Sequence, residues 1–531
     1  MHPAQFENEL TLATHQQDGT VEEFHAAYED ALDAVRAGLG EFHPLRIDGT
    51  PVETGERFTV RSPGDSDLVI GEFAAGGDDT VDRAVRAAAR AFEDWRTTPP
   101  ETRAGIFADA AGVFRDWKFE LAATITLENG KNRTEAMADV DEAIDFLRFY
   151  GRELERRDGY EFDTGQPTPE QRCENLLRPY GVFGVVAPFN FPLAILTGMT
   201  TGATITGNTA VVKPASATPL IAHAFVDALE EAGLPDGVVN LVTGGGRAVG
   251  EPLVEHEEVA GVAFTGSREV GRDIQRTFLE SGKPGPVVAE LGGKNPVVVT
   301  ASADLEAAVS GVRMGAFSFS GQKCSATARV YVEEAVFEDF ADRLVEETAA
   351  LPVVPPEDRS AVLSPVIDER ALERYRDICA RAQSEGTIRT GGEVVDDPDL
   401  PPGRYVEPTV VTGVPHDHDL AREEHFLPFV TLHPVEDLAE GIARSNDSDY
   451  GLCAGLFSGD DSEIEAWFDR VQSGMCYVNR AQSATTGALV QAQPFGGWKD
   501  SGTTGKFAGG YWYLPQFMRE QTRTLVDDGE R

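Results

Sequence analysis

Apolar residues between positions 181 and 290 occur in short runs that alternate with segments of helical periodicity. Short apolar strands alternating with helices favour a parallel sheet that is covered on both faces. Ligands of such sheets bind beyond the carboxyl ends of the strands, so this region predicts a Rossmann-like, nucleotide-binding domain. We expect strands at 182–187, 209–213, 238–242, 259–264 and 286–290, with helices from Pro192, over 218–232, after Gly244–Gly246 and over 267–280.

The same alternation resumes after position 295 and predicts a second α/β unit. A cysteine segment follows the first helix of this unit, so the cysteine and the nucleotide site are expected in different units. The expected strands are 296–300, 329–332, 404–411, 428–434, 452–458 and 475–478, and the expected helices are 303–318, 335–351, 368–385, 436–446 and 461–472.

The first 154 residues are mainly of helical pattern, with a strand pair over 44–60. We expect helices at 21–39, 80–95 (with Thr80 as N-cap), 100–117, 119–129 and 133–154. Residues 155–180 and 506–531 are candidate two-stranded extensions. The predicted division is a nucleotide-binding domain (20–154 and 181–290), a second domain (291–485) and an oligomerisation extension (155–180 and 506–531), which implies a homodimer or a higher homo-oligomer.

The chain is strongly acidic. It has 89 acidic and 46 basic residues among 531, a formal net charge of −43, and only eight of its basic residues are lysines. This composition resembles proteins of salt-loving archaea, where salt screens the self-repulsion; the alternative is an acidic enzyme of ordinary habitat. Such a field repels phosphate backbones, so we expect no nucleic-acid partner.

The cysteines and the N-terminus indicate a cytoplasmic protein. The five cysteines form no CxxC pair and no metal-ligand spacing, so we expect neither a disulfide framework nor a metal site. Residues 1–9 lack the basic start and apolar core of a signal peptide. The uncharged stretch 180–212 contains Pro188 and Pro192, which would break a membrane-spanning helix, so we expect no membrane partner.

Three polar segments carry candidate chemistry. Residues 317–326 (FSFSGQKCSA) place Cys324 among glycine and small polar residues beside Lys323. A free cysteine is more often a small core residue, but a polar, glycine-containing loop favours a nucleophile. Residues 290–296 (ELGGKNP) begin with Glu290 at the end of an apolar strand, where the alternatives are a general base or a salt bridge to an arginine. Residues 187–192 (APFNFP) contain Asn190.

A glycine cluster follows the strand at 238–242. Gly244, Gly246 and Gly250 open a helix, as in phosphate-binding loops, although Val249 stands where the usual fingerprint has its third glycine. The pattern alone fits a tight turn as well as a cofactor loop. Lys213 ends a buried strand, where it is either a solvated cap or a ligand contact.

Together the segments at 187–192, 290–296 and 317–326 resemble the active site of the aldehyde dehydrogenase superfamily. The resemblance implies that a Cys324 thiolate attacks the aldehyde carbonyl, while the Asn190 amide and the Cys324 backbone N–H form an oxyanion hole. Hydride would pass to a nicotinamide, and Glu290 would activate the water that hydrolyses the thioester. A non-catalytic structural relative is one alternative, which the presence of Cys324, Glu290 and Asn190 disfavours. A thioesterase or a phosphorylating acyl transferase is another, and Glu290 discriminates, because hydrolysis needs a water-activating base whereas transfer to phosphate or coenzyme A does not.

The resemblance also implies NAD as the cofactor. Ser216 stands where many NAD-specific relatives carry a glutamate that would repel a 2′-phosphate, so NADP also stays open. Leu427 replaces the usual glycine in the segment that would hold the nicotinamide ribose. The implied cofactor residues are Pro188, Lys213, Ser216, Gly246, Gly250, Gly266, Ser267, Glu424 and Phe426.

Within the superfamily the chain is similar to enzymes that oxidise L-glutamate γ-semialdehyde to L-glutamate in proline catabolism. The similarity extends over residues 20–525 and includes the segments 207–219, 264–271, 477–480 and 493–497. It implies that Ser325, Gly487 and Ala488 anchor the amino-acid end of the substrate, while Phe191 and Phe495 flank its chain. The loop at 480–486 and the tail at 509–515 depart from the usual pattern, so a broader semialdehyde or aliphatic aldehyde dehydrogenase is the alternative.

Overall fold

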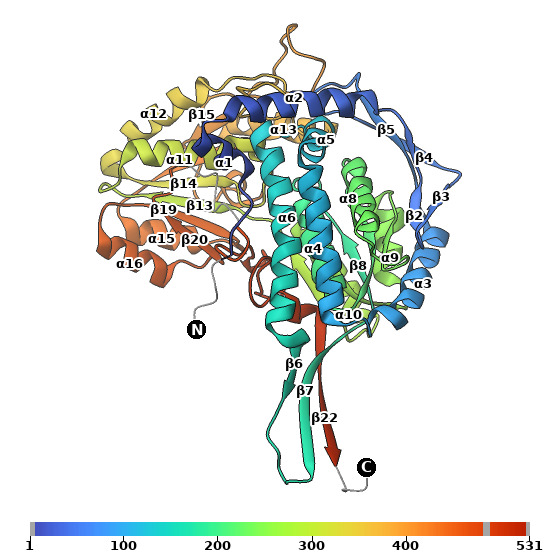
Figure 1. Cartoon of the computed structure of the whole chain (residues 1–531). Coiled ribbons are helices and arrows are strands. Elements are labelled where there is room, and N and C mark those ends of the chain that lie inside the picture. Colours follow the sequence, from blue (N-terminus) through green and yellow to red (C-terminus); the bar gives the residue numbers. More distant parts are fainter. Residues whose placement is uncertain (1–5, 482–488, 527–531) are drawn as a thin grey trace.

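The computed structural model describes residues 6–481 and 489–526. It contains two seven-stranded sheets, each with its own helices, and a long three-stranded arm that projects away from both (Figure 1). The long helices α4 (Pro100–Asp116) and α6 (Arg133–Arg156) run through the middle of the molecule in Figure 1. The predicted class, an α/β protein with two α/β units and a β-extension, is observed.

The first sheet has the order β12-β11-β8-β9-β10-β2-β3. All five strands predicted between 181 and 290 are present and parallel to one another, because each is an apolar run short enough to cross a buried sheet. The strands are β8 (Val182–Val186), β9 (Thr209–Lys213), β10 (Val239–Leu241), β11 (Val259–Thr265) and β12 (Val287–Glu290), and the helices among them are α7 (Ala194–Ile205), α8 (Pro219–Glu231), α9 (Glu251–Glu255) and α10 (Arg268–Glu280).

The strand pair expected over 44–60 is divided between two sheets, so that prediction was too simple. A hairpin of β2 (Leu45–Ile47) and β3 (Thr50–Val52) extends the first sheet, with β2 antiparallel to β10. The next strand, β4 (Arg57–Arg61), instead pairs with β5 (Val69–Ala74), which also pairs with β1 (Phe42–His43). The turn at Asp48 and Gly49, with φ of 58° and 66°, closes the hairpin before β4 begins.

The second sheet has the order β15-β16-β17-β14-β13-β19-β20. The strand expected over 404–411 covers only Thr409–Thr412, because Pro408 cannot donate a ladder hydrogen bond. The edge strand β15 was not predicted. The strands are β13 (Asn295–Val299), β14 (Thr327–Glu333), β15 (Thr387–Thr390), β16 (Thr409–Thr412), β17 (Phe429–Val435), β19 (Cys453–Phe457) and β20 (Met475–Val478), with helices α11 (Leu305–Phe317), α12 (Phe337–Ala349), α13 (Glu369–Glu385), α14 (Asp419–Arg422), α15 (Leu438–Asn446) and α16 (Asp461–Arg470).

The N-terminal helices agree with the pattern apart from two details. Helix α3 begins at Asp78, two residues before the expected cap, and the Thr80 hydroxyl accepts a hydrogen bond from the Gly77 N–H from inside the first turn. The short polar helix α1 was not predicted. The helices are α1 (Thr11–Asp18), α2 (Val21–Ala37), α3 (Asp78–Trp95), α4, α5 (Lys118–Asn129) and α6.

The arm consists of β6 (Glu161–Asp163), β7 (Gln171–Pro179) and β22 (Met518–Val526). Strand β22 pairs antiparallel with β7 along its whole length, from Met518 opposite Pro179 to Val526 opposite Gln171. The two predicted extensions therefore form one sheet. A small pair of β18 (Tyr450–Gly451) and β21 (Trp498–Lys499) lies elsewhere.

Two further properties bear on function. Across residues 6–481 and 489–526, no helix combines the length and apolarity that a membrane crossing needs. Over the same residues, no three His, Cys, Asp or Glu side chains are placed to share a metal ion. All five cysteines are free thiols.

Candidate active site

The cysteine loop leaves α11 with an uncommon backbone. Phe319 and Ser320 have φ of 52° and 49°, and Gly321 follows at 66°. A left-handed conformation costs a non-glycine residue about 1–3 kcal/mol, so the surrounding contacts must stabilise it. Gly321 has no alternative, because a side chain there would collide with the Leu427 carbonyl.

Residues 364–367 supply those contacts. The Ser320 hydroxyl donates to the Ser364 carbonyl (2.5 Å) and accepts the Ser364 N–H (2.9 Å). The Gln322 amide donates to the Pro365 carbonyl (3.1 Å), and its oxygen accepts the Ile367 N–H (2.9 Å). The loop is therefore fixed by buried side chains on both sides of its turn.

The loop places Cys324 on a cavity of about 350 Å³. Four other predicted residues line the same cavity: Glu290 from the end of β12, Phe191 from the loop after β8, Ser325 and Phe495. These residues are separated by up to 304 positions in the sequence and come together here. A nucleophile, a carboxylate and two aromatic rings thus face one space.

Among the described residues, the predicted catalytic residue Asn190 is not part of this cavity lining. Asn190 is buried beside Phe191, and the oxyanion role of its amide stays a prediction. Gly487 and Ala488 lie outside the described residues. The same holds for most of the 480–486 loop.

Glu290 has a carboxylate that is only partly satisfied. The Gly497 N–H donates to it, while Oε2 is buried without a hydrogen-bond partner in the described part of the chain. Burial raises the pKa of Glu290 well above its usual value, against the opposing effect of the Gly497 N–H. No arginine or lysine of residues 6–481 or 489–526 forms an ion pair with it, which removes the salt-bridge alternative for these residues and leaves a proton-accepting group at the cavity.

The thiol of Cys324 is held in its protonated form. Burial, and then the charges of Glu424 and Glu290, raise its pKa, while the backbone N–H groups of Ser325 and Cys324 act in the opposite direction. These backbone N–H dipoles, and not the ammonium of Lys323, are the groups that favour the thiolate. The Lys323 ammonium turns away and binds Glu135 Oε1 (2.6 Å) and the Ser318 hydroxyl (3.0 Å).

The glycine loop of the first sheet lies next to Lys213 and Ser216. The Ser216 hydroxyl donates to the Gly244 carbonyl (2.9 Å), and Gly250 approaches the Lys213 side chain. Gly244 has φ of 147°, and a side chain there would come within 2.7 Å of Val249. The missing third glycine is thus explained, because buried Val249 packs over Gly244.

Lys213 is buried and its ammonium donates to the Pro214 carbonyl (2.9 Å). Burial lowers its pKa to about 8, and no carboxylate of the described residues pairs with it. A buried, unpaired cation at a carboxyl strand end suits a polar or anionic ligand. Gly246 and Gly250 form one helical turn just before α9.

The remaining cofactor candidates are linked to the catalytic groups. Gly266 donates its N–H to the Glu290 carbonyl (3.2 Å), and Ser267 caps α10 through the Val270 N–H. Glu424 Oε1 accepts the Gly293 N–H (2.9 Å), and burial raises its pKa to about 7.

Phe426, with φ of 59°, meets the Phe189 ring edge-on at 5.8 Å between centroids. Phe189 directly follows Pro188, so this contact brings the loop after β8 against the segment that carries Glu424. Predicted cofactor segments from both sheets are therefore in contact at this point.

The pattern gave no sign of a buried ion pair beneath the cavity. Lys131 and Asp139 are fully buried and 2.9 Å apart, and the Lys131 ammonium lies 3.6 Å from the centre of the Phe191 ring. Asp139 also accepts the Ala194 N–H (2.7 Å). This pair fixes the ring that lines the cavity, and a charged residue in a helical sequence gives no signal of such a role.

Comparison with known proteins agrees with this geometry. The family model "Aldehyde dehydrogenase family" matches residues 50–523. A 1-pyrroline-5-carboxylate dehydrogenase from Bacillus cytotoxicus is 39% identical over 511 residues, which cover 95% of this chain and 97% of that protein. A relative of the same name from Bacillus thuringiensis is 38% identical over 513 residues, 95% of this chain and 97% of its own.

Solved structures show the same fold. The structure of a 1-pyrroline-5-carboxylate dehydrogenase from Thermus with bound NAD has a TM-score of 0.92 at 35% identity, covering 99% of this chain and all of that one. A betaine aldehyde dehydrogenase from Staphylococcus aureus in complex with NAD+ has a TM-score of 0.88 at 29% identity, covering 94% and 98%. The predicted fold class and superfamily are confirmed: the chain belongs to the aldehyde dehydrogenase family.

Proposed function

We propose that this protein oxidises L-glutamate γ-semialdehyde to L-glutamate with NAD as the hydride acceptor. The observation that carries the proposal is the single cavity onto which Cys324, Glu290, Phe191, Ser325 and Phe495 open. The names of the Bacillus and Thermus relatives support the choice of substrate.

Cys324 begins the reaction. Its sulfur bonds to the aldehyde carbon as the thiol proton leaves, and the carbonyl oxygen of the substrate gains the electron pair of the broken π bond. The backbone N–H groups that already face the sulfur are placed to stabilise this oxygen, with the Asn190 amide as the proposed second donor. One such donor lowers the activation barrier by about 3 kcal/mol.

We propose that the nine cofactor residues named from the sequence hold NAD. The glycine turn at 246–250 and the unpaired ammonium of Lys213 suit the polar part of a dinucleotide, and Glu424 suits ribose hydroxyl groups. NAD held by these residues would supply the hydride acceptor for oxidation of the thiohemiacetal. NADP is a second candidate cofactor, because Ser216 carries no charge that would repel a 2′-phosphate.

Glu290 completes the reaction. With a raised pKa and one unsatisfied oxygen, it can take a proton from water as that water attacks the thioester. The C–S bond then breaks, the acid product leaves, and the sulfur regains a proton. Transfer to phosphate or coenzyme A would not need this base, so Glu290 favours hydrolysis over acyl transfer.

The test is steady-state NAD reduction in concentrated KCl with glutamate γ-semialdehyde, succinate semialdehyde and propanal. We expect the first to have the largest kcat/KM, by at least about tenfold. Comparable values for all three would replace the assignment by a broader aldehyde dehydrogenase. No reduction by a folded sample would support a non-catalytic relative.

We also propose three properties that concern the whole molecule. The arm of β6, β7 and β22 mediates a homo-oligomer, which its exposed apolar side chains Phe162, Leu525 and Val526 support. The domains divide as predicted, with the sheet boundary between Glu290 and Asn295. The protein works in the cytoplasm and in concentrated salt, for which the net charge of −43 is the argument. Light scattering and activity against KCl concentration test the first and the last.

A further inference from the structure

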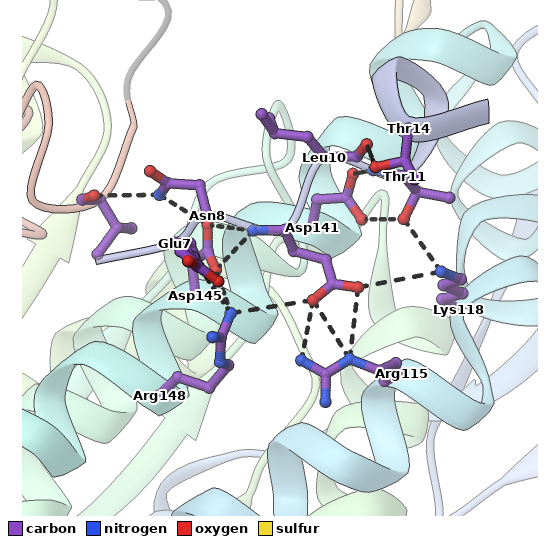
Figure 2. A network of polar contacts seen from close by, with 12 residues as sticks. Glu7, Asn8, Leu10, Thr11, Thr14, Arg115, Lys118, Asp141, Asp145 and Arg148 are labelled. Atoms are coloured by element: carbon purple, nitrogen blue, oxygen red, sulfur yellow. Dashed lines mark hydrogen bonds and ion pairs between the residues drawn. The ribbon is translucent and has the colours of Figure 1, made fainter. Parts of the chain in front are cut away.

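Residues 6–11, named the N-terminal segment below, bind α6, and Glu9 and Leu10 of this segment line the cavity. Figure 2 shows the polar contacts of the segment. Asp145 of α6 accepts hydrogen bonds from the Asn8 amide (2.8 Å) and the Glu9 N–H (3.0 Å). Asp141, one turn earlier, accepts the Thr11 N–H (2.8 Å) and hydroxyl (2.7 Å). Both carboxylates are buried, so the segment satisfies groups that would otherwise be costly.

The same segment also binds the chain around position 490. The Asn8 amide donates to the Val490 carbonyl (3.0 Å), and the Phe6 N–H donates to Gln491 Oε1 (2.7 Å). Gln491 has φ of 66°, and its amide donates to the Tyr511 hydroxyl (2.7 Å). Asn8 therefore connects α6 to residues 489–491 through one side chain.

Side chains of the segment also contact helices α4 and α6. The Phe6 ring is buried and meets Phe149 edge-on at 5.5 Å. The Glu9 carboxylate forms an ion pair with Arg115 (2.9 Å) and lies 3.9 Å from Arg148. The segment is thus anchored on α4 and α6 at several points.

The N-terminal segment and its contact partners form part of the cavity lining. The lining includes Glu9 and Leu10 from the segment, Asp141 and Asp145 from α6, and Leu489 and Val490, which lie next to the segment through Asn8. The same cavity contains Cys324 and Glu290. The Asn8–Val490 contact therefore joins two parts of this lining across 482 positions of sequence.

We propose that the N-terminal segment is a specificity element: through Asn8 it positions Leu489 and Val490, and so determines how well the cavity holds a long, polar aldehyde. This inference rests on the proposed function for the identity of that aldehyde. Asn8 is a positioning residue, since its contacts are to Asp145 and Val490. A short aldehyde such as propanal does not need the distal wall, so its oxidation does not depend on the segment.

The experiment compares Asn8→Ala with Gln17→Ala in the full chain. Gln17 is an exposed amide on α1, outside the cavity lining, and makes a matched control. We expect Asn8→Ala to raise KM for glutamate γ-semialdehyde about tenfold with kcat within about twofold, and to leave kcat/KM for propanal within about twofold. Gln17→Ala should equal the wild type with both aldehydes.

A second measurement does not depend on the substrate. Hydrogen–deuterium exchange of a peptide that covers 489–495 should rise in Asn8→Ala and stay unchanged in Gln17→Ala. Thr11→Val, which removes the hydroxyl contacts to Asp141 and Lys118 and keeps the backbone contact to Asp141, should change KM in the same direction by a smaller factor.

The outcomes separate the two proposals. A wild type without preference for the semialdehyde refutes the proposed function, whereas the exchange result still tests the segment. Equal kinetics and equal exchange in Asn8→Ala and Gln17→Ala overturn the inference. A parallel loss of kcat for both aldehydes, together with a lower Tm, also overturns it, because the segment would then only stabilise the fold.

Discussion

The carboxyl edges of the two sheets build their halves of the site in different ways. At the first sheet the contacts come from the backbone: Gly244, Gly250 and Gly266 let the chain turn closely, and Ser216 bonds to a carbonyl. Around the cavity beside the second sheet, contacts between side chains matter more, as in the ion pairs Lys131–Asp139 and Lys323–Glu135. A backbone site depends on local conformation, while a side-chain site depends on partners from distant parts of the chain.

Lysine usage shows the same contrast. Four of the eight lysines, at positions 131, 213, 294 and 323, are buried. Only Lys213 belongs to the glycine edge, where no carboxylate of the described residues pairs with it. An acidic protein with few ammonium groups has thus placed half of them inside, at or near the site, where a charge interacts most strongly.

The variant with the largest expected effect should lose catalysis while NAD binding at the first sheet is retained. Cys324→Ala should lower kcat/KM by about 10⁴-fold or more, since no other thiol lines the cavity formed by described residues. NAD binding, measured by fluorescence titration, should stay within about threefold, because the backbone edge is untouched. A large loss of NAD affinity would show that the two edges are not independent.

Glu290→Gln should lower kcat by about 10²–10⁴-fold, the usual contribution of a general base. The acyl-enzyme should then accumulate, so rapid mixing should reveal a burst of about one NADH per active subunit before the slow steady state. A steady state without a burst would mean that Glu290 acts before hydride transfer. Glu280→Gln on the exposed end of α10 is the matched control.

Lys131→Met should destabilise the protein by about 3–5 kcal/mol, because it leaves the Asp139 carboxylate buried without its cation. Denaturant unfolding in constant KCl measures this change. The exposed Lys506→Met should alter stability by less than about 0.5 kcal/mol. If the double variant Lys131→Met with Asp139→Leu were as unstable as Lys131→Met alone, the loss could not come from the unpaired charge.

The value of kcat/KM should rise by about tenfold or more between pH 6 and pH 9. Burial raises the pKa of both Cys324 and Glu290, so the reactive thiolate and carboxylate forms become more populated as the pH increases. Initial rates at constant ionic strength measure this dependence. A flat profile from pH 6 upward would contradict it.

The smallest effect concerns the backbone edge. Ser216→Glu should lower kcat/KM for NADP by about tenfold, through repulsion of the 2′-phosphate, and change the NAD value by less than about threefold. Ser216→Ala separates this charge effect from the hydrogen bond to the Gly244 carbonyl, and should change both cofactors equally. Equal losses for both cofactors in Ser216→Glu would place residue 216 away from the ribose.

The sequence was most informative where neighbouring residues act together. The five strands of the first sheet and the loop around Cys324 were predicted because their residues are contiguous. Helix α1 was missed because it is short and polar, and β15 because an edge strand of four residues follows directly on α13.

Tertiary contacts account for the residues that were missed in the site. Lys131, Asp139 and Asn8 look like ordinary polar residues, and only Phe191, Asp145 and Val490 give them a role. The orientation of Lys323 toward Glu135, away from the thiol, was also hidden, since adjacency in sequence does not fix the direction of a side chain.

The contacts of Phe6 and Asn8 with residues 490 and 491 have a consequence for biosynthesis. A ribosome makes residue 6 long before residue 491. Phe6 and Asn8 therefore cannot form these contacts until almost the whole chain has been translated. The reaction space closes only at the end of this process. An incomplete chain therefore cannot present a finished site to an aldehyde in the cell.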